Sequence, residues 1–196
     1  MNTKHIYLNR LVLPFLTVFF IVSCTADYYP KPKGFFRIDL PEKEFRRFDT
    51  TFPYSFDYPV YAVIEPNDHA EAEPYWINIQ FPAFHGTVHL SYKPIHGNLN
   101  EYLEDTRSMV MKHIPKATGI ENRQFVNIEK DIYSLTYAIS GTGAASPYQF
   151  YITDSLHHFI RGALYFNTIP NNDSLSPVIR FLMEDIDHLI ETFEWK

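Results

Sequence analysis

The sequence predicts an α+β fold in which two main helices pack on an antiparallel sheet, preceded by an extended N-terminal arm. Several short segments alternate between apolar and polar residues, as half-buried strands do, and two longer segments carry apolar stripes at helical spacing. Short turns separate most of the predicted strands, with one helix between them and one at the end of the chain. This order favours antiparallel pairing over a parallel sheet, in which a crossover follows each strand.

The first strands lie in the middle of the chain. The apolar residues at every second position are Tyr75, Ile77, Ile79 and Phe81 in one segment, and Val88, Leu90 and Tyr92 in the next. Both segments predict strands with one buried face. Pro94 ends the second strand, because proline cannot donate to the hydrogen-bond ladder of a sheet.

A helix of about four turns follows these strands. Its apolar residues lie at helical spacing and are Leu99, Tyr102, Leu103, Thr106, Val110 and Ile114. Asn98 is the expected N-cap, with Glu101 three residues later as its capping-box partner. Lys112, His113 and Pro115 indicate the end of this helix.

The alternating pattern then returns and predicts four strands, over residues 125–129, 133–140, 148–153 and 158–166. Asp154 and Ser155 provide the turn before the last strand, and the glycine-rich residues 141–145 are expected to form a hairpin loop. The final helix is expected to start at Ser176, with Pro177 at its first helical position. The core is expected to contain Ile77, Ile79, Val88, Leu90, Leu103, Leu135, Ile139, Phe150, Leu182, Ile186 and Leu189.

The N-terminus has the features of a lipoprotein signal peptide. Lys4 and Arg10 precede an apolar run from Leu11 to Val22, and Ser23 and Cys24 follow it. A helix of this run would be about 18 Å long, too short for a hydrocarbon core of about 30 Å. The small residue before Cys24 resembles the bacterial lipobox, which implies cleavage after Ser23 and acylation of Cys24, with chains such as palmitate. A plain secretory signal with a chance cysteine is the alternative. The chain then divides into a signal peptide (1–23), an arm (24–61) and a globular domain (62–196).

Composition excludes several classes of function. The chain has 17 basic and 23 acidic residues, and residues 1–23 contain two of the basic ones and none of the acidic, so the remainder carries a formal charge of −8. Such an acidic domain is a poor binder of nucleic acid. Cys24 is the only cysteine, so its acylation leaves no thiol for disulfides or catalysis. The histidines show no metal-ligand spacing, and Asp154, Ser155 and His158 lack the elbow of a serine hydrolase. We expect a non-enzyme with no cofactor or metal beyond the covalent lipid.

The arm is the segment in which we expect a partner to bind. Residues 28–61 contain eleven aromatic, five proline and six basic residues, too many large rings for a free tether. Prolines stiffen an extended backbone, and aromatic residues and arginine are common interface anchors. The expected contact residues are Tyr29, Pro30, Lys31, Pro32, Lys33, Phe35, Phe36 and Arg37. The alternative is that Phe35 and Phe36 pack on the protein's own sheet.

Three segments, together with the lipobox, resemble the gliding-motility lipoprotein family GldD of the Bacteroidetes. These segments are residues 29–38, 148–166 and 172–178, and the resemblance extends over essentially the whole chain after Cys24. It implies a lipid-anchored envelope protein that is required for gliding and linked to type IX secretion, and it implies no catalytic residue. The order of elements is also loosely similar to the sandwich of PsbP and Mog1 proteins, a similarity of fold only.

Two functions remain open at this point. One is an accessory or scaffold component of the gliding machinery, in contact with the lipid bilayer and with other envelope motility and secretion proteins. The other is a periplasmic lipoprotein that binds a glycan, lipid or metal on a sheet face, for which Trp76 and the many tyrosines are suited. The residues after Cys24 favour a periplasm-facing location and leave the choice of membrane undecided.

Replacing Cys24 by alanine is expected to abolish acylation and membrane retention. No other segment is apolar enough to replace the anchor, and stable anchoring needs two or more acyl chains. Fractionation after metabolic labelling with a fatty acid measures both effects. Normal membrane retention of the alanine variant would contradict the lipobox interpretation.

Overall fold

A computed structural model describes residues 38–196. Its strands are β1 (Phe45–Phe48), β2 (Tyr54–Pro59), β3 (Val63–Pro66), β4 (Ile77–Phe81), β5 (Gly86–Pro94), β6 (Gly119–Asn127), β7 (Ile132–Ser140), β8 (Tyr148–Thr153), β9 (His158–Phe166) and β10 (Glu194–Trp195). The α-helices are α2 (Leu99–Met111) and α3 (Asn172–Glu191), and the short 3-10 helices are η1 (Pro82–Phe84), η2 (Ile114–Lys116) and η3 (Ile128–Lys130).

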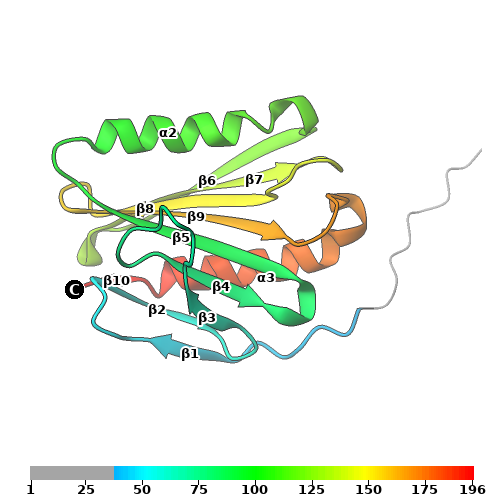
Figure 1. Cartoon of the computed structure of the whole chain (residues 1–196), viewed down its shortest axis with the longest axis horizontal. Helices are drawn as coiled ribbons and strands as arrows, with labels where there is room; N and C mark the ends of the chain where they lie inside the picture. Colours follow the sequence, from blue (N-terminus) through cyan, green and yellow to red (C-terminus); the bar gives the residue numbers. More distant parts are fainter. Residues whose placement is uncertain (1–37) are drawn as a thin grey trace, which may run out of the picture. The chain divides into compact units, whose positions relative to one another are not determined.

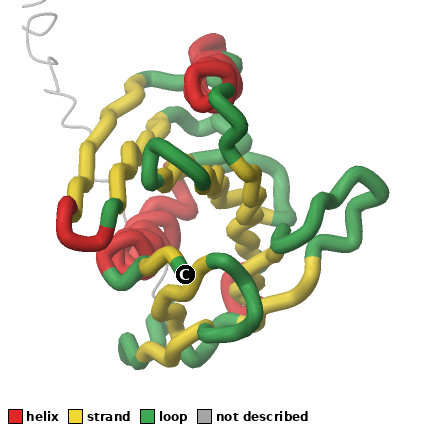
Figure 2. The backbone as a smooth tube through the Cα atoms, turned by 90° about the vertical axis from the view of Figure 1, so that its left-hand side faces the viewer, coloured by secondary structure: helices red, strands yellow, loops and turns green. Residues whose placement is uncertain are grey.

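The strands form two sheets. Seven strands pair in the order β3-β4-β5-β9-β8-β7-β6, and three pair in the order β1-β2-β10 (Figure 1). Every pair is antiparallel. The large sheet lies between α2 and α3 (Figure 2). The α+β class, the antiparallel pairing and the two packed helices are therefore confirmed.

The main core lies between α3 and one face of the large sheet. Alternate residues of β4, β5, β8 and β9 point to this face, and the small sheet joins α3 in covering it. Tyr54 and Phe56 of β2 and Phe193 beside β10 are completely buried there. Their ring centroids are 5.8–6.2 Å apart. Contacts at this distance contribute roughly 0.5–1.5 kcal/mol per pair beyond the burial of apolar area.

A second, smaller cluster lies under α2 on the opposite face. Val110 of α2 packs there with Tyr137 and Ile139 of β7 and with Ala144 of the following loop. Of the expected core residues, Leu103 and Leu135 are only half-buried, and the others are buried. Leu135 packs at the edge of this smaller cluster.

Three sequence predictions of local structure are wrong in part. Asn98 lies at the N-cap position of α2, as expected, but its side chain makes no capping hydrogen bond, because its Oδ1 instead accepts the N–H of His96 at 2.9 Å. The strand expected over residues 125–129 spans residues 119–127, and the Asn127 side chain accepts the N–H of Lys130 and closes η3.

The last helix also begins earlier than expected. It starts at Asn172, and Pro177 lies inside it. The buried Asn172 amide donates to the carbonyl oxygens of Gly141 and Ala144 at 3.0 and 2.9 Å. These bonds fix the start of α3 to the β7–β8 loop, which is the hairpin loop that the sequence predicts.

The described part of the arm packs on the domain. Residues 45–59, which the sequence analysis assigns to the arm, form β1 and β2. Arg46 of β1 lies over the Tyr58 ring, 4.6 Å from its centroid, and donates to the carbonyl oxygen of Ala62. Much of the aromatic content of residues 28–61 therefore serves the fold itself.

Gly162→Ala in β9 is expected to destabilise the protein by about 1–3 kcal/mol, the usual cost of overpacking a core. A Cβ at this position would lie 2.1 Å from Cζ of the Phe150 ring, which is completely buried. Urea unfolding of the variant measures the loss. Gly119→Ala in β6 is the matched control, because no atom lies within 4 Å of a Cβ there. Equal stability of both variants would contradict the packing described here.

Candidate functional site

The predicted lipidation and partner-binding residues lie outside the described residues. They are Cys24, Tyr29, Pro30, Lys31, Pro32, Lys33, Phe35, Phe36 and Arg37, and the described chain begins at Ile38. Both sites therefore stay predictions. The described residues nevertheless show how the chain that follows the arm is attached, and where a ligand could bind.

A buried ion pair fixes the chain near its first described residues. The Lys43 ammonium donates to Oδ1 of Asp185 and to the carbonyl oxygen of Phe181, both at 2.9 Å, and lies over the Phe181 ring. Asp185 is 1% exposed on α3, and its Oδ2 accepts the hydroxyl of Tyr61 at 2.5 Å. Both carboxylate oxygens thus have charge-assisted partners, which are the strong kind of hydrogen bond. We call Lys43, Tyr61 and Asp185 the α3 clamp.

Burial governs the protonation of the clamp. It raises the pKa of Asp185, although the hydrogen bonds from Tyr61 and Lys43 act in the opposite direction. Burial, together with the hydrogen bond to Asp185, also raises the pKa of the Tyr61 hydroxyl. Tyr61 therefore remains a donor at neutral pH, and Lys43 supplies the positive charge that the carboxylate needs.

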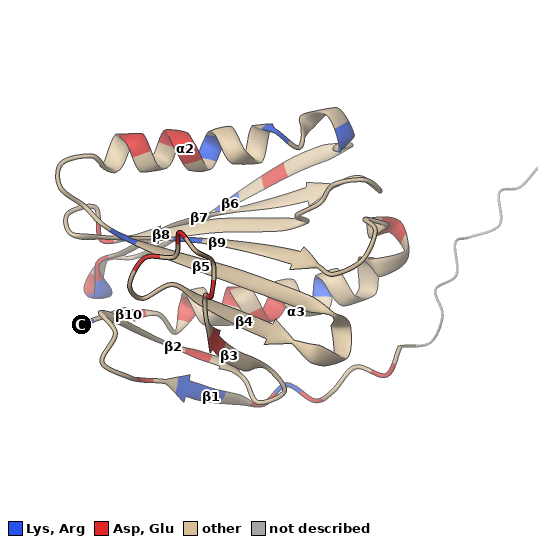
Figure 3. Cartoon of the chain, in the orientation of Figure 1, with Lys and Arg blue, Asp and Glu red and all other residues tan. Residues whose placement is uncertain are grey.

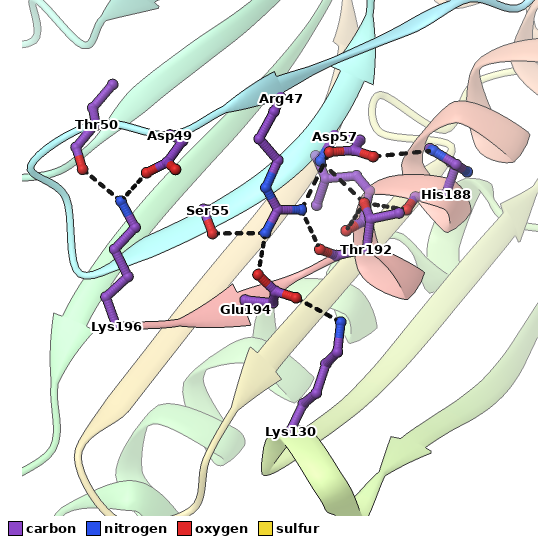
Figure 4. A network of polar contacts seen from close by, with 11 residues as sticks. Arg47, Asp49, Thr50, Ser55, Asp57, Lys130, His188, Thr192, Glu194 and Lys196 are labelled. Carbon is purple, nitrogen blue, oxygen red and sulfur yellow. Dashed lines mark hydrogen bonds and ion pairs between the residues drawn. The ribbon is translucent and has the colours of Figure 1, made fainter.

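A network of polar contacts ties the small sheet to the end of α3 (Figure 4). Arg47 of β1 donates to the carbonyl oxygen of Thr192 at 2.8 Å and pairs with Asp57 and Glu194. Glu194 also pairs with Lys130 at 2.7 Å. These groups are partly exposed, so each pair contributes little alone, but together they connect β1 to the end of α3 and to β10.

The other face of the large sheet contains a groove beside α2. Its inner part is a cavity of about 280 Å³. The cavity is lined by Trp76, Ser91, Lys93, Tyr102, Asp105, Thr106, Met109, Phe159 and Arg161. Its aromatic wall is ordered, because Tyr102 packs on Phe159 with ring centroids 5.4 Å apart. Trp76 donates its Nε1–H to the carbonyl oxygen of Tyr92 at 2.7 Å.

The outer part of the groove is more polar. This cavity of about 550 Å³ lies beside the acidic loop that joins β3 to β4 (Figure 3) and is lined by Asn67, His69, Glu71, Glu73, Trp76, His89 and Lys93. The two cavities share Trp76 and Lys93, so we treat them as one sheet-face groove. Lys93 pairs with Glu73 and lies over the Trp76 ring, 5.3 Å from its centroid.

Arg161 is the unusual residue of the groove. No carboxylate of the described chain pairs with it, and its buried Nε atom has no hydrogen-bond partner. Its Nη2 donates to Oε1 of the fully buried Gln149 at 2.8 Å, and Gln149 contacts Nε2 of His113 at 2.9 Å. Burial lowers the pKa of Arg161, which reflects the cost of a cation without a counter-charge.

Two histidines and the Asp154 turn make hydrogen bonds within the fold. In the described chain no three His, Cys, Asp or Glu residues gather as metal ligands. His89 bonds Asn78 at 2.7 Å, and His158 bonds the hydroxyl of Tyr92 at 2.8 Å. Oδ1 of Asp154 accepts the backbone N–H groups of residues 156–158, as an aspartate in a turn commonly does. These hydrogen bonds lower the pKa of Asp154 despite the opposing effect of burial.

Sequence reasoning missed both the clamp and Arg161, although each left a signal. Asp185 interrupts the apolar stripe of α3, beside Leu182 and Ile186. Arg161 follows two buried apolar residues in β9 and precedes more of them. A charged residue within an apolar pattern needs a partner. Asp185 has partners that are far away in the sequence, whereas Arg161 has no oppositely charged partner in the described chain.

Comparison with known proteins identifies the family. The family model described as "Gliding motility lipoprotein GldD" matches residues 25–195. The chain belongs to this family. It is thus a member of a family of lipoproteins of gliding motility, as the resemblance in the sequence implies.

The other comparisons add less. No curated protein matches the chain. The solution structure of cyanobacterial PsbP (CyanoP) from Synechocystis sp. PCC 6803 has a TM-score of 0.49 and 10% identity, over 80% of this chain and 95% of that one. In the described chain, no helix has the length and apolar character needed to cross a membrane.

Lys43→Met is expected to destabilise the protein by about 1–3 kcal/mol at neutral pH. Removing one partner of a fully buried pair costs about 3–5 kcal/mol, and the 27% exposure of Lys43 reduces that cost. Burial raises the pKa of Asp185 in the folded protein, so its carboxylate becomes protonated as the pH falls toward 4. A neutral carboxyl group needs no positive partner, so the loss of stability caused by removing Lys43 should become smaller at low pH.

Urea unfolding of the variant and the wild type between pH 4 and 8 tests this prediction. Lys112→Met, at an exposed position at the C-terminal end of α2, is the control and should change stability by under about 0.5 kcal/mol at every pH. A loss that is independent of pH would show that the clamp does not act through the charge of Asp185.

Proposed function

We propose that this protein is a lipid-anchored, non-enzymatic accessory or scaffold component of the envelope machinery for gliding, linked to type IX secretion. The family match over residues 25–195 is the observation that supports it most directly. Its partners are the lipid bilayer, through acyl chains on Cys24, and other envelope motility and secretion proteins. We place the domain on the periplasmic side of the membrane that holds the lipid.

The α3 clamp limits the distance between the domain and the bilayer. Lys43 is bonded to α3 and lies 19 positions after Cys24. A fully extended chain of that length spans at most about 65 Å, so the domain works within that distance of the bilayer. Arg37 lies six positions before Lys43, which limits its reach to about 20 Å from the clamp.

The arm supplies contact chemistry suited to such a partner. Lys31, Lys33 and Arg37 form a basic group in a chain whose mature charge is −8, and so favour an acidic partner surface. Pro30 and Pro32 lower the entropy cost of docking by restricting the unbound backbone. Both arguments apply to contacts with another protein rather than to chemistry on a substrate.

Tyr29→Ala combined with Arg37→Ala is expected to stop gliding or type IX secretion while leaving the melting temperature within about 2 °C of wild type. Both positions precede the described fold, so their loss should remove partner contacts and spare the core. Colony spreading and secretion in a strain that carries only the variant give the functional result, and thermal unfolding of the purified protein gives the structural one.

The control is Leu156→Ala combined with Lys112→Ala, at two exposed positions of the domain. It matches the test variant in losing one large side chain and one charge, and it should glide normally. If the arm variant unfolds the domain, the arm is structural and the partner surface lies elsewhere.

A second function is supported by the sheet-face groove. We propose that the protein also holds a small ligand there, because Trp76, Tyr102 and Phe159 provide an aromatic wall next to polar groups and an unpaired cation. Cavities with this mixture are typical of ligand sites. Native mass spectrometry of protein purified from its own envelope tests this function through a retained mass, which the groove-filling variant Met109→Trp should lose.

A further inference from the structure

We propose that the sheet-face groove binds an acidic saccharide, a short sugar chain in which one unit carries a carboxylate. This inference rests on the second proposed function and names the chemical class of its ligand. It is argued from the charge of the inner cavity, from the aromatic wall and from the polar outer cavity.

The strand side of the inner cavity, where Arg161 lies, calls for an anion. Arg161 lines it without a carboxylate partner in the described chain, whereas the other cation, Lys93, already pairs with Glu73. Gln149 holds one side of the Arg161 guanidinium and has no charge to offset it. Asp105 lies on the α2 side of the cavity and pairs with no cation of the described chain. A ligand carboxylate near Arg161 would supply the missing counter-charge, in the planar geometry that a guanidinium prefers.

The preorganisation of Arg161 supports a binding role. Its strand is central in the large sheet, with β5 on one side and β8 on the other. Tyr165 lies four residues further along β9 on the same face, and Gln149 accepts a hydrogen bond from Nη2 of Arg161 at 2.8 Å. A side chain held in this way loses little entropy when a ligand arrives, which increases affinity.

The walls of the groove suit a sugar ring. Trp76 and Tyr102 lie on opposite elements, the β3–β4 loop and α2, and both line the inner cavity. Flat rings of this kind present apolar faces to the C–H groups of a saccharide while their polar ends remain hydrogen-bonded. Tyr102 already donates to the carbonyl oxygen of Pro94 at 3.3 Å, so its ring position is fixed.

The outer cavity provides partners for hydroxyl groups. Asn67, His69, Glu71 and His89 line it, and each can donate or accept a hydrogen bond. Because Trp76 and Lys93 belong to both cavities, one chain of two or three sugar units can extend from Arg161 to this polar end. A fatty acid would suit the inner cavity but would gain no hydrogen bonds from these polar groups, which argues for the saccharide.

Calorimetric titration of the full-length protein with glucuronosyl-xylobiose, which carries a single carboxylate, and with neutral xylotriose tests this inference. We expect the acid to bind at least about tenfold more tightly than the neutral sugar, since hydrogen bonds between two charged groups are roughly twice as strong as neutral ones. Arg161→Gln should remove this preference, and Arg107→Gln, an exposed arginine on α2, should keep it. Met109→Trp, at a 40% exposed position of the rim, should block both ligands even if Arg161→Gln fails to fold.

The outcomes separate this inference from the function on which it rests. Equal binding of the two sugars, or an Arg161→Gln variant that keeps the preference, would overturn the acidic ligand while groove binding stands. Binding of neither sugar would overturn the saccharide class, and the retained mass in native protein then decides the ligand-binding function separately. Binding that survives Met109→Trp would show that the sugars bind outside the groove.

Discussion

The buried contact among Tyr54, Phe56 and Phe193 is the interaction on which the rest of the structure depends. It joins β2, near the start of the described chain, to residues beside β10 at its end, and closes both over the large sheet. The small sheet depends on this packing, because its strands have only two to six residues. Short strands of this kind are stable only when they pack against something else. The Arg47 network and the α3 clamp add polar contacts that fix the orientation of the small sheet, whose position is determined by the aromatic packing.

This arrangement gives the two faces of the large sheet different roles. The face toward α3 is filled with apolar side chains and leaves little room for chemistry. The opposite face is covered by α2 in the region from β7 to β9, where Val110 and Tyr102 make their contacts. On β4 and β5 it instead carries polar cross-strand pairs, such as Thr87 with Gln80 and His89 with Asn78. A partly covered polar face is where an antiparallel sheet can bind a ligand without loss of core.

The sequence predicted what depends on local periodicity and missed what depends on distant partners. The strands over residues 133–140, 148–153 and 158–166 follow from alternation, and both helices from their apolar stripes. The predicted start of α3 was wrong, because the actual start depends on hydrogen bonds from Asn172 to a loop some thirty residues away. No sequence pattern at the start of a helix encodes such a contact. Asp185 and Lys43 are 142 residues apart in the sequence, so no local pattern predicts their contact. The environment of Arg161 likewise depends on residues of neighbouring strands and of α2, which only the folded sheet brings together. The lipid site and the arm contacts rest on the sequence alone.

The positions of the clamp and the groove make two separate activities physically compatible in one small domain. Asp185 lies on α3 and Arg161 on the face of the sheet toward α2, so a whole layer of strands separates them. Packed layers are about 10 Å apart, and changes at sites separated by more than 7–10 Å usually have independent energetic effects. A change at the clamp therefore need not disturb the ligand proposed for the groove. The lipid anchor brings both to the same stretch of membrane, where each acts at a raised effective concentration.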